Sequence, residues 1–373
     1  MAIRARADAC PGVFATHDAA DGALARVRLP GGRLTAGQLH VLAGCAEDLG
    51  DGSLHLTSRG NVQLRGLNRD DGSLVRRLSD AGLLPAPSHE RVRNFLASPL
   101  SGLAGGLLDV RPLVTALDAA VCARPELAGL PGRFLFAFDD GRGDVSAEDP
   151  DVCWHALSPS TGALLLASFD TGLRVEVQEA VSALVDMALR FLAVRGPAWR
   201  VRELPELSVL HPGMARTAPP RGEGAVGLGV FEWGVAGAPL LGELTARQAR
   251  RIAEIAEWAV VTPWRSIVLP SDGDLGDLGD LGDLHGTGLL TDPDAPGARV
   301  SACIGRPGCA RSRADVRAEA RRVLDALPVR DRVHFSGCER RCGKPRGPYV
   351  DVVAGPGQDT WASSTTTAGR ETQ

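Results

Sequence analysis

Apolar side chains recur every three to four positions in two segments of the chain, and this spacing predicts two amphipathic helices. The apolar positions are Leu39, Leu42, Ala43 and Ala46 in the first segment and Ile252, Ala253, Ile255 and Ala256 in the second. Each segment opens with the pattern T-x-x-Q, at Thr35–Gln38 and at Thr245–Gln248. This pattern is typical of a capping box, so both helices are predicted to begin there.

The two predicted helices belong to a longer repeat. A short β-rich run follows each helix, LHLT in the first copy and AVVT in the second, and an arginine stands just past the threonine. That arginine is Arg59 in TSRGN and Arg265 in TPWRS. A longer segment with mixed helix and strand patterns follows each copy. The sequence therefore predicts an α+β chain in which two unlike units, A and B, are duplicated in the order A-B-A′-B′.

Charge and composition narrow the classes of partner. The net charge is −4, which argues against nucleic acid as the main partner. The N-terminal stretch MAIRARADACPG has no apolar core of a signal peptide, and no run of about eighteen apolar residues occurs. We therefore expect a cytoplasmic protein with no membrane partner. Lys344 is the only lysine, so a P-loop cannot be formed by this sequence.

Four of the eight cysteines form two pairs in the last quarter of the chain. Cys303 and Cys309 flank a Gly-Arg-Pro-Gly turn, and Cys338 and Cys342 stand in SGCERRCGKP. Two disulfides, a structural zinc ion and a [4Fe–4S] cluster are the alternatives. A reducing compartment disfavours disulfides, and zinc usually takes tighter C-x₂₋₄-C knuckles than the first pair offers. The spacing and the glycine-rich turns favour the cluster, with Cys303, Cys309, Cys338 and Cys342 as its ligands.

The cysteine spacing and the duplication resemble the sulfite and nitrite reductases that use sirohaem. TSRGNVQLRG is similar to the arginine-bearing strand of that family, and RNFLASPLSG to its second anion-facing segment. The resemblance implies that Arg59 and Arg93 line a tetrapyrrole cleft, with Asn61, Gln63 and Asn94 as further cleft candidates. It also implies that Cys342 is shared between the cluster and the sirohaem iron.

The resemblance further implies the domain organisation. The domains expected are a first ferredoxin-like half-domain at 8–75, a first reductase-type αβ domain at 88–205, a second ferredoxin-like half-domain at 220–285, a second reductase-type domain with the 4Fe–4S cluster at 286–355, and a disordered tail at 356–373. The D-L-G run at 272–288 is interpreted as a surface loop, and its role stays open.

One departure from the reductases changes the expected reaction. Those enzymes carry two lysines on a strand that follows a proline, whereas LPGRFLFAF places Arg133 and Leu135 there. Arginine stays protonated and is a poor proton donor. The chain resembles the related precorrin-3B synthase family more closely, in its ACPGVF opening, its TPWRSI segment and its length. Arginines bind carboxylates in bidentate fashion, so Arg59, Arg93, Arg133 and Arg265 are the candidates for gripping a carboxylate-rich ring.

That second resemblance implies a monooxygenase of aerobic cobalamin biosynthesis. It would use O₂ to convert precorrin-3A to precorrin-3B by hydroxylation at C20 with γ-lactone formation. Electrons would come ultimately from NADH through a separate reductase, because no flavin or NAD(P) fingerprint follows a predicted strand. The family also implies a mononuclear non-haem iron; its ligands are unknown, and the histidines considered are His17, His211, His285 and His334. A sirohaem-dependent sulfite or nitrite reductase is the alternative, ahead of a zinc-binding scaffold and an iron–sulfur electron carrier.

Overall fold

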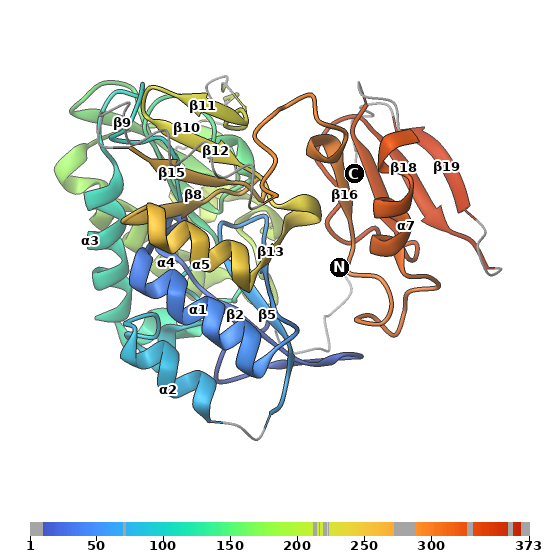
Figure 1. Cartoon of the computed structure of the whole chain (residues 1–373). Helices are drawn as coiled ribbons and strands as arrows, with labels where there is room; N and C mark the ends of the chain where they lie inside the picture. The colour runs from blue at the N-terminus through green and yellow to red at the C-terminus, as the bar shows by residue number, and fades with distance from the viewer. Residues whose placement is uncertain are drawn as a thin grey trace.

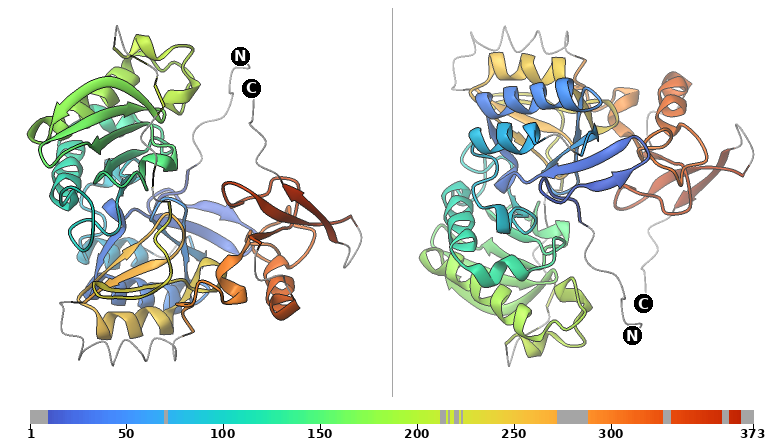
Figure 2. Two further views of the ribbon diagram at one scale, coloured as in Figure 1. Left: turned by 90° about the horizontal axis from the view of Figure 1, so that it is seen from above. Right: turned by 90° about the horizontal axis from the view of Figure 1, so that it is seen from below.

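The computed structural model of the chain describes residues 10–69, 72–211, 215, 217–218, 222, 224–271, 288–326, 331–356 and 361–366. Figure 1 shows helices and strands mixed throughout, and the last lobe, from β16 onward, stands beside the rest of the molecule. The two views in Figure 2 place the elements of the repeat between this lobe and the lobe built around β6–β10. Within the described residues, no helix is long and apolar enough to cross a membrane.

The repeat forms two five-stranded antiparallel sheets, each completed by a strand from the other copy. The first sheet has the order β1 (His17–Ala19), β2 (Gly22–Val27), β5 (Val62–Leu67), β4 (Ser53–Leu56) and β13 (Glu243–Thr245). The second has the order β11 (Gly229–Phe231), β12 (Gly234–Gly237), β15 (Ile267–Pro270), β14 (Trp258–Val261) and β3 (Arg33–Thr35). Because β3 and β13 cross over, neither copy completes its own sheet.

The two predicted amphipathic helices are α1 (Ala36–Leu49) and α5 (Ala246–Ile255), and they lie side by side (Figure 1). Both begin with the predicted capping box, in which the threonine hydroxyl accepts from the backbone N–H of Gln38 or Gln248 at 3.2 Å. Their apolar stripes share one core with both sheets and with the short helix α2 (Ser73–Asp80). Cys45 is fully buried in that core.

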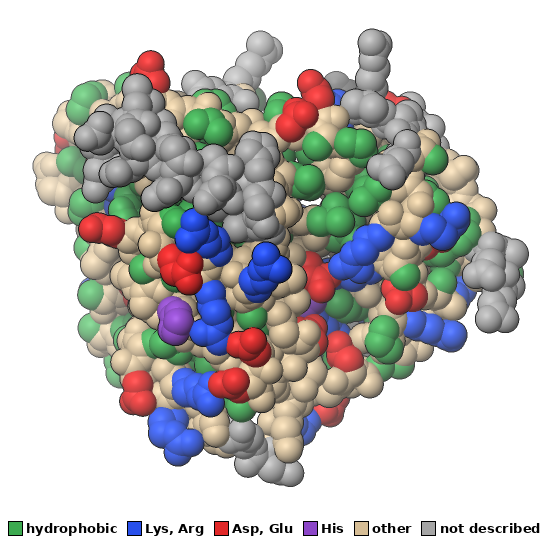
Figure 3. All heavy atoms as spheres, viewed as in Figure 1, with side chains coloured by type: hydrophobic (Ala, Val, Ile, Leu, Met, Phe, Trp, Pro, Cys, Tyr) green, Lys and Arg blue, Asp and Glu red, His purple; other side chains and the backbone are tan. Residues whose placement is uncertain are grey.

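The outer face of these helices carries charges of both signs. Figure 3 shows arginine side chains interspersed with Asp and Glu over this face of the molecule. Several of them pair across the two helices or from one helix to its neighbour, as Arg250 does with Glu47 and Arg77 with Asp48. A mixed surface of this kind is typical of a solvated face, so the functional site is sought on the other side of the sheets.

The segment between the two copies folds around a third sheet. Its order is β10 (Phe169–Glu176), β9 (Thr161–Leu166), β8 (Val152–Ala156), β7 (Phe136–Asp139) and β6 (Phe95–Ala97), with β6, β7 and β8 parallel. Helices α3 (Arg111–Cys122) and α4 (Ala180–Val194) cover one face and pack on Phe134, Phe136 and Phe138. Leu135 alternates to the opposite face, where it joins a small separate cluster.

The last lobe holds the four paired cysteines. Its sheet has the order β16 (Val300–Ala302), β17 (Val333–Ser336), β18 (Tyr349–Ala354) and β19 (Trp361–Thr366), and α7 (Val316–Arg322) packs on one face. The first three strands are parallel and β19 is antiparallel to β18. The prediction of a disordered tail from 356 is wrong for 361–366. Trp361 packs against Phe335, with ring centroids 6.2 Å apart, and this contact anchors the strand.

The D-L-G run from 272 to 287 and His285 within it lie outside the described residues.

Candidate functional site

The four paired cysteines gather at one edge of the last sheet. Cys303 directly follows β16, and Cys338 follows β17, which is parallel to it, so both strands end at the same edge. Burial raises the pKa of the Cys303 thiol, and the nearby thiols of Cys309 and Cys338 raise it further. Burial also raises the pKa of Cys342, followed by the effects of Cys303, Cys338 and Cys309. The thiols are therefore close enough to disfavour one another's charge.

Backbone donors point at these sulfurs. The Gly337 N–H donates to Cys303 Sγ at 3.3 Å, and the Gly305 N–H also lowers the pKa of this thiol. Gly305 has a φ of 70°, and a Cβ there would come within 2.7 Å of the Val316 side chain, so the turn requires glycine. Hydrogen bonds from backbone N–H groups to sulfur are typical of iron–sulfur sites.

The chemistry of these donors fits a [4Fe–4S] cluster. All eight cysteines fall within the described residues, and all are free thiols. Across the described part of the chain, no three His, Cys, Asp or Glu side chains converge on a single metal ion. Four free thiols, one of which accepts from a backbone N–H, are the kind of ligand set that a [4Fe–4S] cluster takes.

The arginines of the repeat stand in two turns with the same hydrogen bonds. In the first turn, the Thr57 N–H donates to the Asn61 carbonyl at 2.9 Å, and in the second the Thr262 N–H donates to the Ser266 carbonyl at 2.9 Å. In both turns the threonine hydroxyl accepts from the residues two and four positions on. The internal duplication therefore extends to single hydrogen bonds.

This shared hydrogen-bond pattern corrects the prediction that Arg59 and Arg265 occupy equivalent positions in the two copies of the repeat. Two positions after the threonine stand Arg59 and Trp264, and three positions after it stand Gly60 and Arg265. Gly60 and Arg265 both have φ near 60° and both donate to the threonine carbonyl, at 3.3 and 3.1 Å. Arg59 therefore corresponds to Trp264, and the two arginines are not equivalent.

Arg59 is half-buried near a second, fully buried arginine. Burial lowers its pKa to about 10, with Arg200 adding to the effect and Asp151 opposing it. Arg200 Nε donates to Asp151 Oδ2 at 2.6 Å. Burial raises the pKa of Asp151 to about 6, against the effects of Arg200 and of two backbone donors. No carboxylate within the described residues forms an ion pair with Arg59, so its guanidinium can receive a ligand anion.

Arg265 connects the repeat to the cysteine loops. Its Nη1 donates to the Gly343 carbonyl, next to Cys342, at 3.3 Å. Burial lowers its pKa, and the nearby Arg317 lowers it further. The neighbouring Trp264 donates from Nε1 to Glu148 Oε1 at 3.0 Å, and Glu148 lies 3.5 Å from Arg346. The middle lobe, the repeat and the cysteine lobe therefore meet at this turn.

Two of the four predicted arginines have other surroundings. Arg93 is buried and forms a bidentate pair with Asp118, at 2.7 and 2.6 Å, while its Nη1 donates to the Leu83 carbonyl. Its guanidinium is thus occupied by a structural ion pair. Arg133 is exposed, and its guanidinium lies 5.1 Å from the centre of the Trp199 ring. The surroundings of Arg93 and Arg133 therefore differ from those of Arg59 and Arg265.

The predicted amide residues are structural neighbours of the first sheet. Asn61 and Asn94 are fully buried and contact each other at 3.3 Å, and Arg28 Nε donates to Asn94 Oδ1 at 3.0 Å. Gln63 stands opposite Arg26 on the neighbouring strand, and with its amide oriented to match that neighbour its oxygen accepts from Arg26 Nε at 3.1 Å. Asn61 and Asn94 therefore do contact each other, but this contact lies in the interior of the protein.

The sheet face opposite α1 and α5 carries charged residues that the sequence analysis missed. Residues paired across the strands share this face: Arg26 with Gln63, Gln63 with His55, and His55 with Glu243. Arg65 lies on the same face and donates to the Gly308 carbonyl, next to Cys309, at 2.8 Å. The sequence pattern that could have indicated these residues is the alternation of polar and apolar side chains in LARVRL and VQLRGL.

Among the described residues, His17, His211 and His334 do not belong to any group of three or more side chains that could hold a mononuclear iron. His17 is exposed on β1, His211 follows the middle lobe, and His334 is buried in β17. Since three suitable side chains nowhere converge on one ion in the described ranges, we assign no ligands to such an iron.

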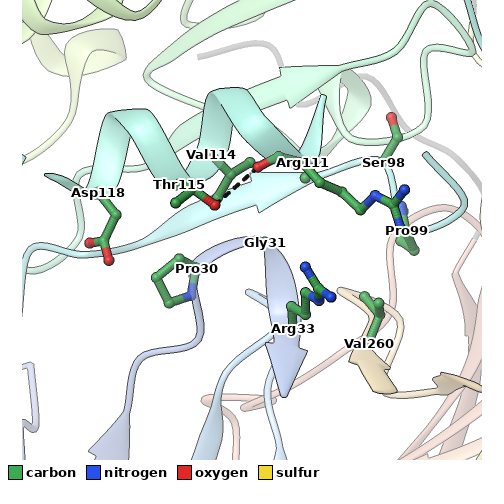
Figure 4. A pocket seen from close by; sticks show the side chains of 11 residues that line it. Pro30, Gly31, Arg33, Ser98, Pro99, Arg111, Val114, Thr115, Asp118 and Val260 are labelled. Carbon is green, nitrogen blue, oxygen red and sulfur yellow. Dashed lines mark hydrogen bonds between the residues drawn. The ribbon is translucent and has the colours of Figure 1, made fainter. Parts of the chain in front are cut away.

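A small cavity lies between the middle lobe and the repeat. Its volume is about 120 Å³, and Figure 4 shows Arg111 of α3 and Arg33 of β3 extending toward it from opposite sides. Both guanidiniums lie near the Trp258 ring, at 5.4 and 4.6 Å from its centre. Arg111 is paired with Asp109 at 2.8 Å. The cavity is too small for a tetrapyrrole, so we regard it as a gap in the packing of the two parts.

Comparison with known proteins agrees with this geometry. The nitrite/sulfite reductase ferredoxin-like half domain matches residues 17–76. A precorrin-3B synthase of Sinorhizobium sp is 27% identical over 380 residues, covering 94% of this chain and 81% of its own. The chain is thus similar to a precorrin-3B synthase over most of its length and to the nitrite/sulfite reductases over its first half-domain. The predicted resemblance is thereby confirmed.

Further relatives match less of the chain or match it at lower identity. Ferredoxin–nitrite reductases of Leptolyngbya laminosa and Synechococcus elongatus are 37% and 38% identical over 35% of this chain, which is 27% of theirs. The NirA protein of Mycobacterium tuberculosis superposes with a TM-score of 0.70 at 19% identity, over 92% of this chain and 73% of its own. The predicted fold class, with ferredoxin-like half-domains in an α+β chain, is confirmed.

Proposed function

We propose that this protein is an oxygen-dependent monooxygenase that converts precorrin-3A to precorrin-3B. The observation that carries the proposal is the meeting of the four thiols with the arginine turns at one place in the molecule, through the contact of Arg265 with the Gly343 carbonyl. The similarity to a precorrin-3B synthase over 94% of the chain supports it. In this reaction one oxygen atom becomes the hydroxyl at C20, an acetate side chain closes the γ-lactone, and the other oxygen leaves as water.

The cluster would be held by Cys303, Cys309, Cys338 and Cys342 and would supply single electrons, ultimately from NADH through a separate reductase. With four cysteine ligands it offers no open iron position. The protein's own task is to bind the ring beside it. Arg59 and Arg265 are the residues we assign to the ring carboxylates, because both are half-buried and neither forms an ion pair with a described carboxylate.

The surroundings of β7 support oxygenation over anion reduction. Leu135 is 2% exposed, and Arg133 lies against Trp199, so neither position of LPGRFLFAF offers an ammonium donor. The six-electron reduction of sulfite or nitrite consumes many protons, and guanidinium groups supply them poorly. A sirohaem-dependent reductase is still a second candidate, because two ferredoxin–nitrite reductases match part of the chain at 37% and 38% identity.

The activity test uses purified protein with its cluster, precorrin-3A, NADH, a flavin-containing reductase and ¹⁸O₂. We expect a product that carries one ¹⁸O atom and whose formation requires both oxygen and the reductase. Product formed without oxygen, or reduction of nitrite or sulfite by the same preparation, would contradict the proposal and favour the second candidate.

A further inference from the structure

The turn that carries Cys309 is contacted by an arginine from the middle strand of the first sheet. Arg65 of β5 donates from Nη2 to the Gly308 carbonyl at 2.8 Å, and Gly308 directly precedes Cys309. Arg65 is 6% exposed, and Gly308 is also buried. Two further hydrogen bonds of this turn stay inside the cysteine lobe, from the Ser312 N–H to the Cys309 carbonyl and from Arg306 Nε to the Ser312 carbonyl. Arg65 therefore links the turn to a different part of the fold.

Asp21 fixes the direction of this guanidinium. It stands in the turn between β1 and β2, and its two carboxylate oxygens accept from Arg65 Nε and Nη2, each at 2.9 Å. Such a bidentate pair sets the plane of the guanidinium group. Nη2 carries two hydrogens, so it can donate to Asp21 and to Gly308 at the same time. In both views of Figure 2 the β1–β2 hairpin extends toward the cysteine lobe.

The backbone at position 308 lies close against this ion pair. A Cβ on Gly308 would be 2.8 Å from Asp21 Oδ2 and 3.2 Å from Arg65 Nη2. It would also be 2.8 Å from Ile304 Cγ1. Any larger residue would have to push the turn away from the pair, so glycine is required for the close approach. This requirement is independent of the hydrogen bond and indicates that the turn is shaped to lie on Arg65 and Asp21.

The pairing of Arg65 with Asp21 distinguishes it from Arg265 at the second cysteine turn. Arg265 also donates to a glycine carbonyl beside a cysteine, that of Gly343, at 3.3 Å. The guanidinium of Arg65, however, already has a carboxylate partner, and the two side chains are 7% and 18% exposed. A neutralised and enclosed guanidinium is poorly suited to bind a ligand anion. The geometry at Arg65 therefore favours a role in holding the turn.

We propose that Arg65, oriented by Asp21, is a positioning residue for the cluster ligand Cys309. Through the Gly308 carbonyl it fixes the turn, so that this thiol is held in place for the cluster before iron and sulfide bind. The inference rests on the proposed function, because it takes Cys309 as a cluster ligand. Its readouts need no turnover, and one of them needs no cluster.

The first test measures the alkylation rate of each cysteine by mass spectrometry in the full-length protein without its cluster. The proteins compared are wild type, Arg65→Gln, Arg65→Lys, Asp21→Asn and the control Arg250→Gln, which loses an exposed pair with Glu47 on the helices of the same repeat. We expect Cys309 to react roughly 10-fold faster in Arg65→Gln and Asp21→Asn, because a loop without its hydrogen bond opens more often. The buried Cys45 should react as in wild type, since the half-domain around it stays folded.

The second test follows the loss of a reconstituted cluster to a chelator by visible absorption, and the reduced cluster by EPR. We expect Arg65→Gln to lose its cluster roughly 10–100-fold faster and to change the EPR spectrum, as loss of a residue that orients a metal ligand does. Arg65→Lys should lie between Arg65→Gln and wild type, because an ammonium group can donate to the Gly308 carbonyl but forms no bidentate pair. Arg250→Gln should match wild type in both tests.

Unchanged alkylation of Cys309 in Arg65→Gln and Asp21→Asn would overturn the inference, and so would an unchanged cluster lifetime. A parallel rise at Cys45 would also overturn it, because the pair would then stabilise the half-domain as a whole. Asp21→Asn changes a more exposed side chain and decides the question if Arg65→Gln does not fold. If wild type takes up no cluster, the proposed function fails, whereas the alkylation of Cys309 still tests whether Arg65 holds the turn.

Discussion

At the scale of single residues, Arg59 and Arg265 differ in their surroundings from the other two arginine candidates, Arg93 and Arg133. Arg59 and Arg265 could be predicted from the repeat, because each follows a threonine in a matching motif. Their different positions in the turn could not be predicted, because these positions depend on which residue of the turn adopts the left-handed conformation. The ion pair between Arg93 and Asp118 could not be predicted from the sequence either, because it joins two elements through a contact that no local pattern indicates.

Replacing Arg265 should weaken substrate binding more than replacing Arg133. Arg265 is half-buried beside the Cys342 loop, whereas Arg133 is exposed and lies on Trp199. Losing a bidentate contact with a carboxylate costs about 1.5–3 kcal/mol, which is roughly 10- to 150-fold in affinity. We expect Arg265→Gln to raise KM for precorrin-3A accordingly and Arg133→Gln to leave it within about twofold. Equal effects in steady-state assays would argue against this assignment.

Breaking the buried pair of Arg93 should destabilise the middle lobe. The side chains of Arg93 and Asp118 are 5% and 20% exposed, so Asp118→Asn leaves a buried charge without its partner. We expect a loss of about 2–4 kcal/mol in the free energy of unfolding. Asp109→Asn, in the more exposed pair with Arg111, is the control and should lose about 1 kcal/mol or less. Urea unfolding followed by tryptophan fluorescence measures both, and a similar loss in the two variants would contradict a structural role for Arg93.

At the scale of elements, the sequence was sufficient to predict a helix or turn where its structure depends on residues close to one another in the chain. The capping boxes and apolar stripes of α1 and α5 were predicted because they depend on residues three and four positions apart. Helix α7 also has a local cap, because Asp315 accepts from the Ala318 N–H at 3.0 Å. Strand β19 was missed because its anchor, the contact of Trp361 with Phe335, is distant in sequence.

The capping box of α5 offers a test of the repeat at this scale. Thr245→Ala removes the hydroxyl that accepts from the Gln248 N–H, and it should lower the free energy of unfolding by about 1 kcal/mol. Thr35→Ala should lower it by a similar amount, because the two caps have the same geometry. Thr115→Ala, on the exposed side of α3, is the control and should change it by less than about 0.5 kcal/mol. Chemical denaturation of the three variants would reveal whether the two caps are equivalent.

At the scale of the whole molecule, stability should depend on pH through Asp144. Its carboxyl is 1% exposed and accepts from Ser98 Oγ at 2.7 Å, while Oδ2 has no hydrogen-bond partner and lies 4.0 Å from Arg142 Nε. Burial, followed by the charge of Asp139, raises its pKa to about 7. The folded state therefore holds a proton that the unfolded state releases at lower pH, and the stabilising contribution of Asp144 is lost as the pH rises through about 7.

The variant Asp144→Asn keeps the neutral form at every pH and isolates this contribution. We expect the stability of wild type to fall between about pH 4 and pH 7 by more than that of Asp144→Asn, which lacks this titration. Midpoints of urea unfolding at several pH values measure the difference. Parallel pH profiles for the two proteins would show that Asp144 is ionised in the folded state near neutral pH.

The position of the cysteine lobe in the whole molecule bears on its function, because Arg65 on β5 and Arg265 in its turn join the repeat to the backbone beside Cys309 and Cys342. The most direct test is the absorption spectrum of anaerobically purified protein, with iron and acid-labile sulfide assays and extraction of any pigment. We expect a brown protein with about four irons and four sulfides per chain and no extractable tetrapyrrole. A sirohaem-like Soret band with extractable pigment would contradict it and identify a sulfite or nitrite reductase, and zinc without visible absorption would contradict the cluster itself.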